Sequence, residues 1–544
     1  MENLTLSAIF FRVHARSATF VGMRSLPKSV WVLFLLVILV VIANAWMSDD
    51  SYITLRTVYH FTEGYGLRWN ISERVQVFTH PLWMMLQVPV YAVVQHAYFT
   101  AIPLNILLTA VSLVFLIRYA KGPNQIYFAL LLLLSSKAFI DYATSGLENA
   151  LSYLLFLLLV HKSGKAAKED PDELLQIVFL SSLLLLTRLD FLLLLAPAVG
   201  WRLYSAGVLR WSTIKVLLLG GLPLVAWEVF ALIYYGSFFP NTYYAKAETG
   251  LPSADLIQQG YRYFQDSLQQ DWFTLPIIIL AIFWGSFQAS GIRRAWALGL
   301  IFYLSYICGV GGDFMSGRFF SVPFLVAILL LQHIEIKHSY TIYACGLVLA
   351  ISLFQPYHPV HIRPSYFQDR KEHVKELYPH GIVDEKGFAW ERSGFLDLRP
   401  WDHVFNIERL LAEVVAQQKN DTINSWEIRV AIGMQGYEAG PGTHIVAQLA
   451  LSDPLLARLP AERRPNWRVG HYFRKIPEGY LKTLRTGQDH FVDRDLAVYY
   501  QHIHRITTTP LWTKERWRSI YLLQSGQLDH LIDRSYYQTP PALD

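Results

Sequence analysis

Residues 30–46 read VWVLFLLVILVVIANAW, and positions 48–53 then read SDDSYI. A helix that crosses a bilayer needs about 20 mostly apolar residues. The first run therefore predicts a spanning helix that brings two adjacent carboxylates, Asp49 and Asp50, to a membrane boundary. No small-residue cleavage site follows, which predicts a retained helix and not a removed signal peptide. Basic residues before the run place the N-terminus in the cytoplasm by the positive-inside rule; they are Arg12, Arg16, Arg24 and Lys28.

Eleven more apolar runs follow, and basic loops between them put 47–81, 236–271 and 311–318 on the outer side. Twelve crossings would return the C-terminal part to the cytoplasm, so one run, in the interrupted region 124–147, is expected to be a half-helix. The prediction is a polytopic α-helical membrane protein with about 11 transmembrane helices. The eleven runs are 82–97, 101–118, 124–140, 148–161, 174–187, 190–206, 214–235, 272–288, 295–310, 319–333 and 339–354.

The density of charge divides the chain into two parts. Charged residues make up 16% of the whole, against about 25% in an ordinary soluble domain. Residues 1–354 hold about 12% and residues 355–544 about 25%. We expect a membrane domain over 1–354 and a periplasmic α/β domain over 355–544, with strands near 427–434 and 444–449. The net charge of +5 is spread thinly, which does not favour nucleic-acid binding.

The pair Asp49 and Asp50 is the sharpest chemical feature. Adjacent carboxylates at a membrane boundary are costly unless they are solvated, paired or bound to a cation. Neighbours on a helix point about 100° apart, so one of them could act as a base while the other orients a partner, binds a cation or caps the helix. An N-cap with water-facing acids is the structural alternative. The stretch after the pair predicts a short amphipathic helix on the membrane surface.

Other ionisable residues gather at the expected outer ends of helices. A transporter would show paired similar halves and charge near the bilayer midplane, and we find no internal repeat. Charge at the outer ends suits chemistry on a lipid-linked substrate at the membrane surface.

Several motifs now give a specific resemblance. The run from Asp49 to Trp83 resembles the first outer loop of polytopic glycosyltransferases of the GT-C type, in particular the terminal β-(1→2)-arabinofuranosyltransferases of mycobacterial cell walls. It is also similar to Gram-negative proteins labelled flagellar motor control proteins. The chain departs from the family pattern at Phe78 and His80, where Tyr and Asn are expected. Further matching segments are 145–149, 187–190, 240–246, 311–320, 433–460 and 467–471.

The resemblance implies the chemistry of residues 1–354. It implies a polyprenyl-phosphate sugar donor, and a carboxylate that activates the acceptor hydroxyl for single-displacement, inverting transfer. The resemblance favours the Asp pair as this base without separating its members; Asp49 is slightly preferred because it lies nearer the helix end. Lys246, Arg318 and Arg188 are the candidates for binding the donor phosphate, with snorkelling to the interface as the structural alternative. The candidates for substrate contact are Asn241, Tyr244, Asp313, Glu148, Asp190 and His80.

Two other functions stay open at this point. One is a GT-C hexosyltransferase, such as a mannosyltransferase, with a polyprenyl-phosphate donor; the other is a non-catalytic membrane protein that affects flagellar motor function. For the leading function the partners are the donor lipid, an envelope glycan or glycoprotein acceptor, and the bilayer of the bacterial inner membrane. No metal-ligand spacing or nucleotide-binding glycine motif is present. Two carboxylates alone do not define a metal site, so a divalent cation at the Asp pair is left open.

Overall fold

The computed structural model describes residues 26–164, 170–207, 210–247, 249–288, 291–334, 338–360, 380–396, 399–417, 422–465 and 467–539. The arginines on which the predicted orientation of the N-terminus depends lie outside these ranges. The helices of the first 354 residues are α2 (Lys28–Ala43), α3 (Asp49–Thr62), α4 (Pro81–Val94), α5 (Ala97–Tyr119), α6 (Pro123–Ser135), α7 (Lys137–Tyr142), α8 (Asn149–Gly164), α9 (Pro171–Leu185), α10 (Phe191–Ala206), α11 (Trp211–Gly220), α12 (Leu222–Tyr235), α13 (Asn241–Ala247), α14 (Ser253–Gln270), α15 (Thr274–Ser286), α16 (Gly291–Gly309), α17 (Arg318–Leu331) and α18 (His338–Phe354).

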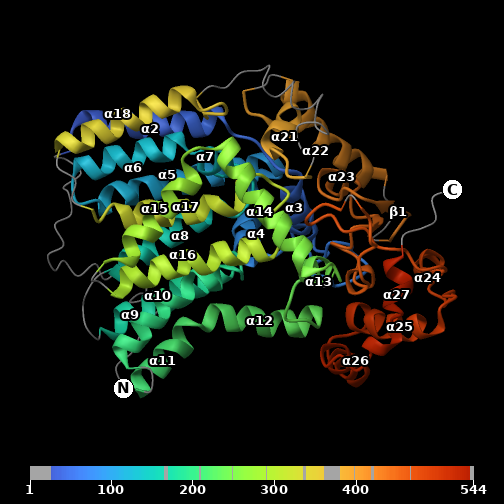
Figure 1. Cartoon of the computed structure of the whole chain (residues 1–544). Coiled ribbons are helices and arrows are strands. Elements are labelled where there is room, and N and C mark those ends of the chain that lie inside the picture. The colour runs from blue at the N-terminus through green and yellow to red at the C-terminus, as the bar shows by residue number, and fades with distance from the viewer. Residues whose placement is uncertain are drawn as a thin grey trace.

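All twelve apolar runs expected from the sequence are helical, and most of these helices form one bundle (Figure 1). Among the described residues, only α5 is by itself long and apolar enough to cross a membrane. The bent pairs α11–α12 and α14–α15, with angles of 54° and 108°, raise the number of such spans to as many as 3. Six other apolar helices have 10–17 residues. About eleven crossings therefore stays a prediction.

The region 124–147 is interrupted, as the sequence indicated. Helix α6 ends at Ser135 and α7 begins at Lys137, where Ser136 Oγ accepts a hydrogen bond from Phe139 N at 3.0 Å. A serine that caps a new helix in this way favours a break at that point. The bend between α11 and α12 lies at Gly221. The helices are also interrupted in the expected outer segment 236–271, where α13 and the strongly amphipathic α14 are separate helices.

Helix α3 confirms the helix expected after the Asp pair, but it is not a surface helix. Almost every side chain from Ser51 to His60 is buried, because α4 and the C-terminal helix α23 (Met434–Glu438) both pack against it. Arg56 shows how the polar side is covered: it is 1% exposed and donates to the carbonyl oxygens of Trp69 at 2.8 Å and Thr443 at 2.9 Å.

The C-terminal residues contain two strands where strands were expected and several helices, but the first strand ends at Arg429, because the chain turns before α23 begins at Met434. Strand β1 (Ser425–Arg429) pairs in parallel with β2 (Thr443–Ala447), Trp426 lying opposite His444. The two-stranded sheet is part of a mostly helical region, and whether residues 355–544 form a separate domain stays a prediction. The helical elements are α21 (Glu385–Ser393), α22 (Arg399–Gln417), α23, η2 (Leu456–Arg458), α24 (Tyr480–Thr486), α25 (Arg494–Thr508), α26 (Lys514–Gln524), η3 (Asp529–Leu531) and α27 (Arg534–Gln538).

Buried charges join the C-terminal part to the helical bundle. The Lys386 ammonium donates to Asp141 and, at 2.8 Å, to Asn44 Oδ1. Lys137 pairs with Asp141 in α7 and with Asp384 at 3.2 Å. A buried charge that loses its partner is strongly destabilising, so this network fixes α21 against the ends of α2 and α7.

Candidate active site

Charged side chains from three separate segments meet at one end of the bundle. The Glu148 carboxylate precedes α8 and lies 3.2 Å from Arg188 Nη1 and 3.4 Å from Arg318 Nη2. Arg188 comes from the turn between α9 and α10, and Arg318 is the first residue of α17. We call the set of Asp50, His80, Glu148, Arg188, Asp190, Asp313 and Arg318 the charge cluster.

Close backbone packing brings Asp50 to this cluster. Gly146 has φ +78°, and a Cβ there would lie 2.5 Å from Ser51 Oγ. Only glycine therefore allows the 145–147 turn to approach α3 so closely. Ser48 N and Ser51 Oγ both donate to the carbonyl oxygen of Ser145, at 3.0 Å and 2.8 Å.

Asp50 is the most open carboxylate of the cluster. Its side chain is 27% exposed, against 1% for Glu148 and 8% for Asp313. Arg318 Nη1 lies 3.9 Å from Asp50 and 3.5 Å from Asp313, so Arg318 has an acidic neighbour in each of two further segments. These contacts are loose, and the buried Nε of Arg318 has no hydrogen-bond partner among the described residues.

Arg188 is held more tightly than Arg318. It donates to Asp190 through Nη2 at 2.7 Å and Nε at 3.0 Å, a bidentate arrangement that fixes the guanidinium plane. Tyr303 Oη donates to the same carboxylate at 3.0 Å. Arg188 thus has fewer free donors than Arg318.

His80, the residue before α4, closes the cluster. Its Nδ1 lies 3.3 Å from Glu148 Oε2 and its Nε2 lies 2.8 Å from Thr54 Oγ1. Burial lowers the pKa of His80, although Glu148 acts in the opposite direction. Burial alone would raise the pKa of Glu148, but Arg318, His80 and Arg188 together lower it to about 2. Glu148 is therefore an ionised anchor that sets the positions of two arginines.

Asp49 has a different environment from Asp50. Its Oδ1 accepts a hydrogen bond from Met434 N at 2.9 Å, and a Cβ at Gly433 would lie 2.3 Å from its Oδ2. Burial raises the pKa of the Asp49 carboxyl, and the Met434 amide opposes that shift. Asp49 thus joins α3 to the loop before α23.

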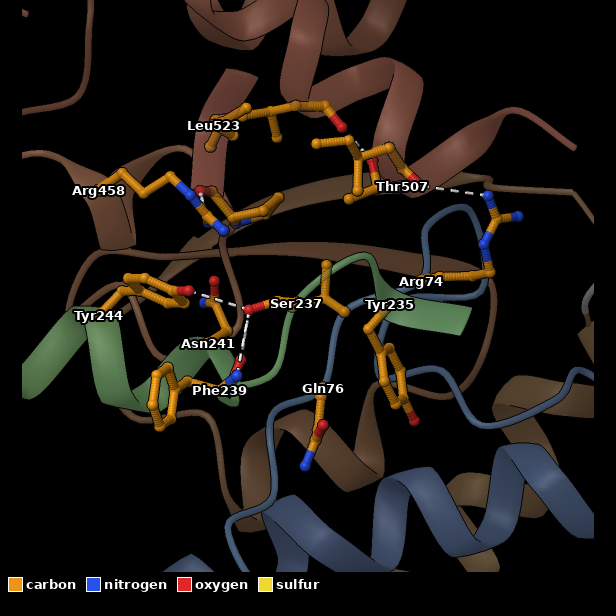
Figure 2. A pocket seen from close by; sticks show the side chains of 14 residues that line it. Arg74, Gln76, Tyr235, Ser237, Phe239, Asn241, Tyr244, Arg458, Thr507 and Leu523 are labelled. Atoms are coloured by element: carbon orange, nitrogen blue, oxygen red, sulfur yellow. Dashed lines mark hydrogen bonds between the residues drawn. The ribbon is translucent and has the colours of Figure 1, made fainter. Parts of the chain in front are cut away.

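The remaining three candidates lie around α13. Asn241 donates to the carbonyl oxygens of Ala450 and Leu451, both at 3.0 Å, and of Asp453 at 3.1 Å. Tyr244 Oη is 3.0 Å from Ser237 Oγ. Both line a small pocket (Figure 2) and are not part of the charge cluster. Lys246 is exposed beside the Gly470 turn, where a glycine Cβ would lie 3.8 Å from its Nζ.

Two C-terminal residues near the cluster were absent from the sequence-based candidates. Arg468 stacks over Phe314 at 4.7 Å and donates to the carbonyl oxygen of Gly381 at 2.9 Å. Burial raises the pKa of Glu385 to about 8, with Arg468 opposing and Asp50, Asp49 and Asp313 reinforcing the shift. Arg468 lies in a segment matched to the family, but nothing in the sequence placed it beside Asp313. No pattern in the sequence marked Glu385 as a candidate.

The described residues contain no group of three or more His, Cys, Asp or Glu side chains arranged to hold a metal ion. The carboxylates of the charge cluster pair with arginine instead.

The known proteins to which this chain is similar in sequence are glycosyltransferases. No family model matches it. The chain is 28% identical over 332 residues to a terminal β-(1→2)-arabinofuranosyltransferase of Corynebacterium glutamicum, covering 52% of this chain and 47% of that protein. It is 26% identical over 523 residues to the protein of the same name from Mycobacterium tuberculosis, covering 80% and 81%. The resemblance found in the motifs is thereby confirmed, although the chain spans only about half the length of the first relative.

One solved structure is also similar. It is the crystal structure of ArnT from Cupriavidus metallidurans bound to undecaprenyl phosphate, with 14% identity and a TM-score of 0.45 over 78% of this chain and 86% of that chain. This score is too low to establish a shared fold.

Proposed function

We propose that this protein is a GT-C type glycosyltransferase of the bacterial inner membrane. It moves a sugar, arabinofuranose or a related pentose, from a polyprenyl-phosphate donor to an envelope glycan or glycoprotein. The N-terminus is cytoplasmic, and the charge cluster and residues 355–544 face the periplasm. The names of both relatives support the reaction class and the sugar.

The observation that carries the proposal is the pairing of one open carboxylate with one loosely held arginine. Asp50 is the most exposed acid of the cluster. Arg318 lies 3.4–3.9 Å from the carboxylates of Asp50, Glu148 and Asp313. A positioned carboxylate accelerates attack by a sugar hydroxyl by about 10²–10⁴-fold. A guanidinium with unused donors stabilises a phosphate leaving group. We assign Asp50 as the base and Arg318 as the main phosphate-binding residue, and we keep Lys246 as a further candidate for binding the phosphate.

The other members then have supporting roles. Arg188 is fixed by Asp190, and Glu148 is the shared partner that holds Arg188 and Arg318 in place. Asp49, which the sequence slightly favoured as base, instead ties α3 to the Met434 loop. The displacement forms the new glycosidic bond and breaks the bond from the anomeric carbon to the phosphate. The acceptor proton goes to Asp50, and the anomeric configuration is inverted.

The test is transfer by the full chain in detergent, with a synthetic polyprenyl-phosphoryl arabinofuranose and an oligosaccharide acceptor. Asp50→Asn is expected to lower kcat by about 10²–10⁴-fold, whereas Asp49→Asn lowers it less. Release of polyprenyl phosphate, measured by mass spectrometry, reports the reaction. Full activity of Asp50→Asn at normal protein level would overturn the assignment. Absence of transfer from pentose and hexose donors alike would favour a non-catalytic role.

A further inference from the structure

A second concentration of positive charge lies away from the charge cluster, at the C-terminal end of α12. Arg74 and Arg516 donate to carbonyl oxygens at the C-terminal end of α25, Arg68 lies near Arg74, and Arg458 is the last residue of η2. None of the four has a carboxylate within 4.0 Å in the part of the chain that the structure describes. Burial lowers the pKa of Arg74, and the neighbouring Arg68 lowers it further. The region is therefore cationic and lacks its own counter-charge.

Two of these arginines line one pocket, from opposite sides (Figure 2). Arg74 and Arg458 line a cavity of about 30 Å³ together with Ser237, Phe239, Asn241 and Tyr244, and its lining contains no acidic residue (Figure 2). That volume holds about two water-sized groups, since one such group needs about 10–15 Å³. It suits a small anion attached to a longer molecule.

The arginines keep free donors. Arg74 is 6% exposed, and its Nη2 donates to the carbonyl oxygens of Thr509 and, at 3.3 Å, Ile506, but its buried Nε has no partner. Arg458 Nη1 donates to the carbonyl oxygen of Pro454 at 2.8 Å, and the guanidinium stacks over Tyr244 at 4.5 Å. Arg516 differs, because its three nitrogens all donate to carbonyl oxygens. Arg68 also keeps an Nε without a partner among the described residues, but it does not line the pocket, so Arg74 and Arg458 are the two arginines available to a ligand there.

The surroundings indicate what the anion is attached to. Phe238, Phe239 and Tyr243 are 46%, 43% and 43% exposed beside the pocket. Tyr235, the last residue of α12, lines the pocket, and Val229 in the preceding part of that helix is 51% exposed. Exposed aromatic side chains next to a cationic pocket suit a group whose phosphate is carried on a lipid.

We infer that the pocket between Arg74 and Arg458 binds a phosphate group, at a site separate from the charge cluster. Planar guanidinium groups bind phosphate oxygens through paired hydrogen bonds, and a bound phosphate supplies the missing counter-charge. The site does not depend on the proposed transfer reaction.

The test is equilibrium binding by the full chain in detergent, with radiolabelled inorganic phosphate and with short-chain phosphatidic acid as separate probes. Arg318→Gln is used as the background, because it removes phosphate that binds at the charge cluster. On that background Arg458→Gln is expected to weaken binding at least ten-fold, and Arg458→Lys by less. Arg518→Gln removes an exposed charge from the neighbouring α26 and is the matched control, expected to bind as the background does.

The two probes distinguish the source of the phosphate. Equal affinity for both means that the phosphate group alone is recognised, and tighter binding of phosphatidic acid means that the lipid contributes. Arg74→Gln is a second variant and is expected to act in the same direction. Failure of the Arg318→Gln protein to bind either probe, or unchanged binding after Arg458→Gln, would overturn the inference. Loss of transfer in Asp50→Asn with intact pocket binding would leave the inference standing.

Discussion

The molecule uses arginine in two opposite ways. In the charge cluster, Arg188 and Arg318 both contact Glu148, and each has a further acidic neighbour. In the pocket near α12, the partners of Arg74 and Arg458 among the described residues are carbonyl oxygens and, for Arg458, an aromatic ring. Paired arginines hold a fixed geometry at the cost of their free donors, whereas unpaired arginines keep donors for a ligand. Arg318 is intermediate, since it is paired but loosely held, which is why we place the phosphate of the donor there.

The largest effect on stability is expected when Glu148, the acid shared by the two arginines of the charge cluster, is removed. Glu148→Gln leaves Arg188 and Arg318 without their common partner, and the loss of one member of a buried ion pair costs about 3–5 kcal/mol. Denaturant unfolding of the purified protein measures the change. The control is Glu413→Gln, because Glu413 is 57% exposed and pairs with Arg409 at 3.6 Å; such surface pairs contribute about 0–1 kcal/mol. Equal effects of the two changes would mean that the cluster does not stabilise the fold.

The second prediction concerns Glu385, beside the cluster. Its pKa is about 8 in the folded protein and about 4.3 when unfolded, so between these values the native state holds a proton that the unfolded chain has released. The stability from this group is fully present below about pH 4.3 and is lost as the pH rises through 8. Glu385→Gln is expected to remove part of a decline in thermal stability between pH 6 and pH 8, on the order of 1 kcal/mol per pH unit. An identical pH slope in parent and variant contradicts the raised pKa.

The third prediction tests the wall of the pocket. Asn241→Ala removes hydrogen bonds to three carbonyl oxygens, and unsatisfied buried groups cost about 1–3 kcal/mol each. The variant should lose stability by about that amount, while Asn424→Ala, at an exposed position, changes little. A raised KM with unchanged stability would instead restore the substrate-binding role expected from the sequence.

The smallest effect is expected at an unpaired arginine. Arg458→Met keeps the packing against Tyr244 and removes a charge that has no acidic partner, so the stability should change by less than about 1 kcal/mol. The two substitutions can be compared directly. Glu148→Gln leaves two arginines without their shared partner, whereas Arg458→Met leaves no charge unpaired. A loss as large as that of Glu148→Gln would show that Arg458 is structural.

The sequence by itself determined the helices and most members of the site. All twelve apolar runs are helical because spacing and hydropathy are local properties that each segment carries with it. The break near Ser136 was also readable, since serine and interrupted hydropathy act locally. Seven of the candidate residues meet in one cluster because family motifs mark them even when they are far apart in the chain.

Only the tertiary structure decided which residues share an environment. It separated Asp49 from Asp50, because the Met434 amide reaches one and not the other. It buried α3, which its amphipathic pattern had placed at a surface, by packing residues almost 400 positions away against it. It also moved Asn241 and Tyr244 to a separate pocket and brought Glu385 toward the cluster. Such contacts depend on how distant segments pack, and no local pattern in the sequence specifies which of those segments come together.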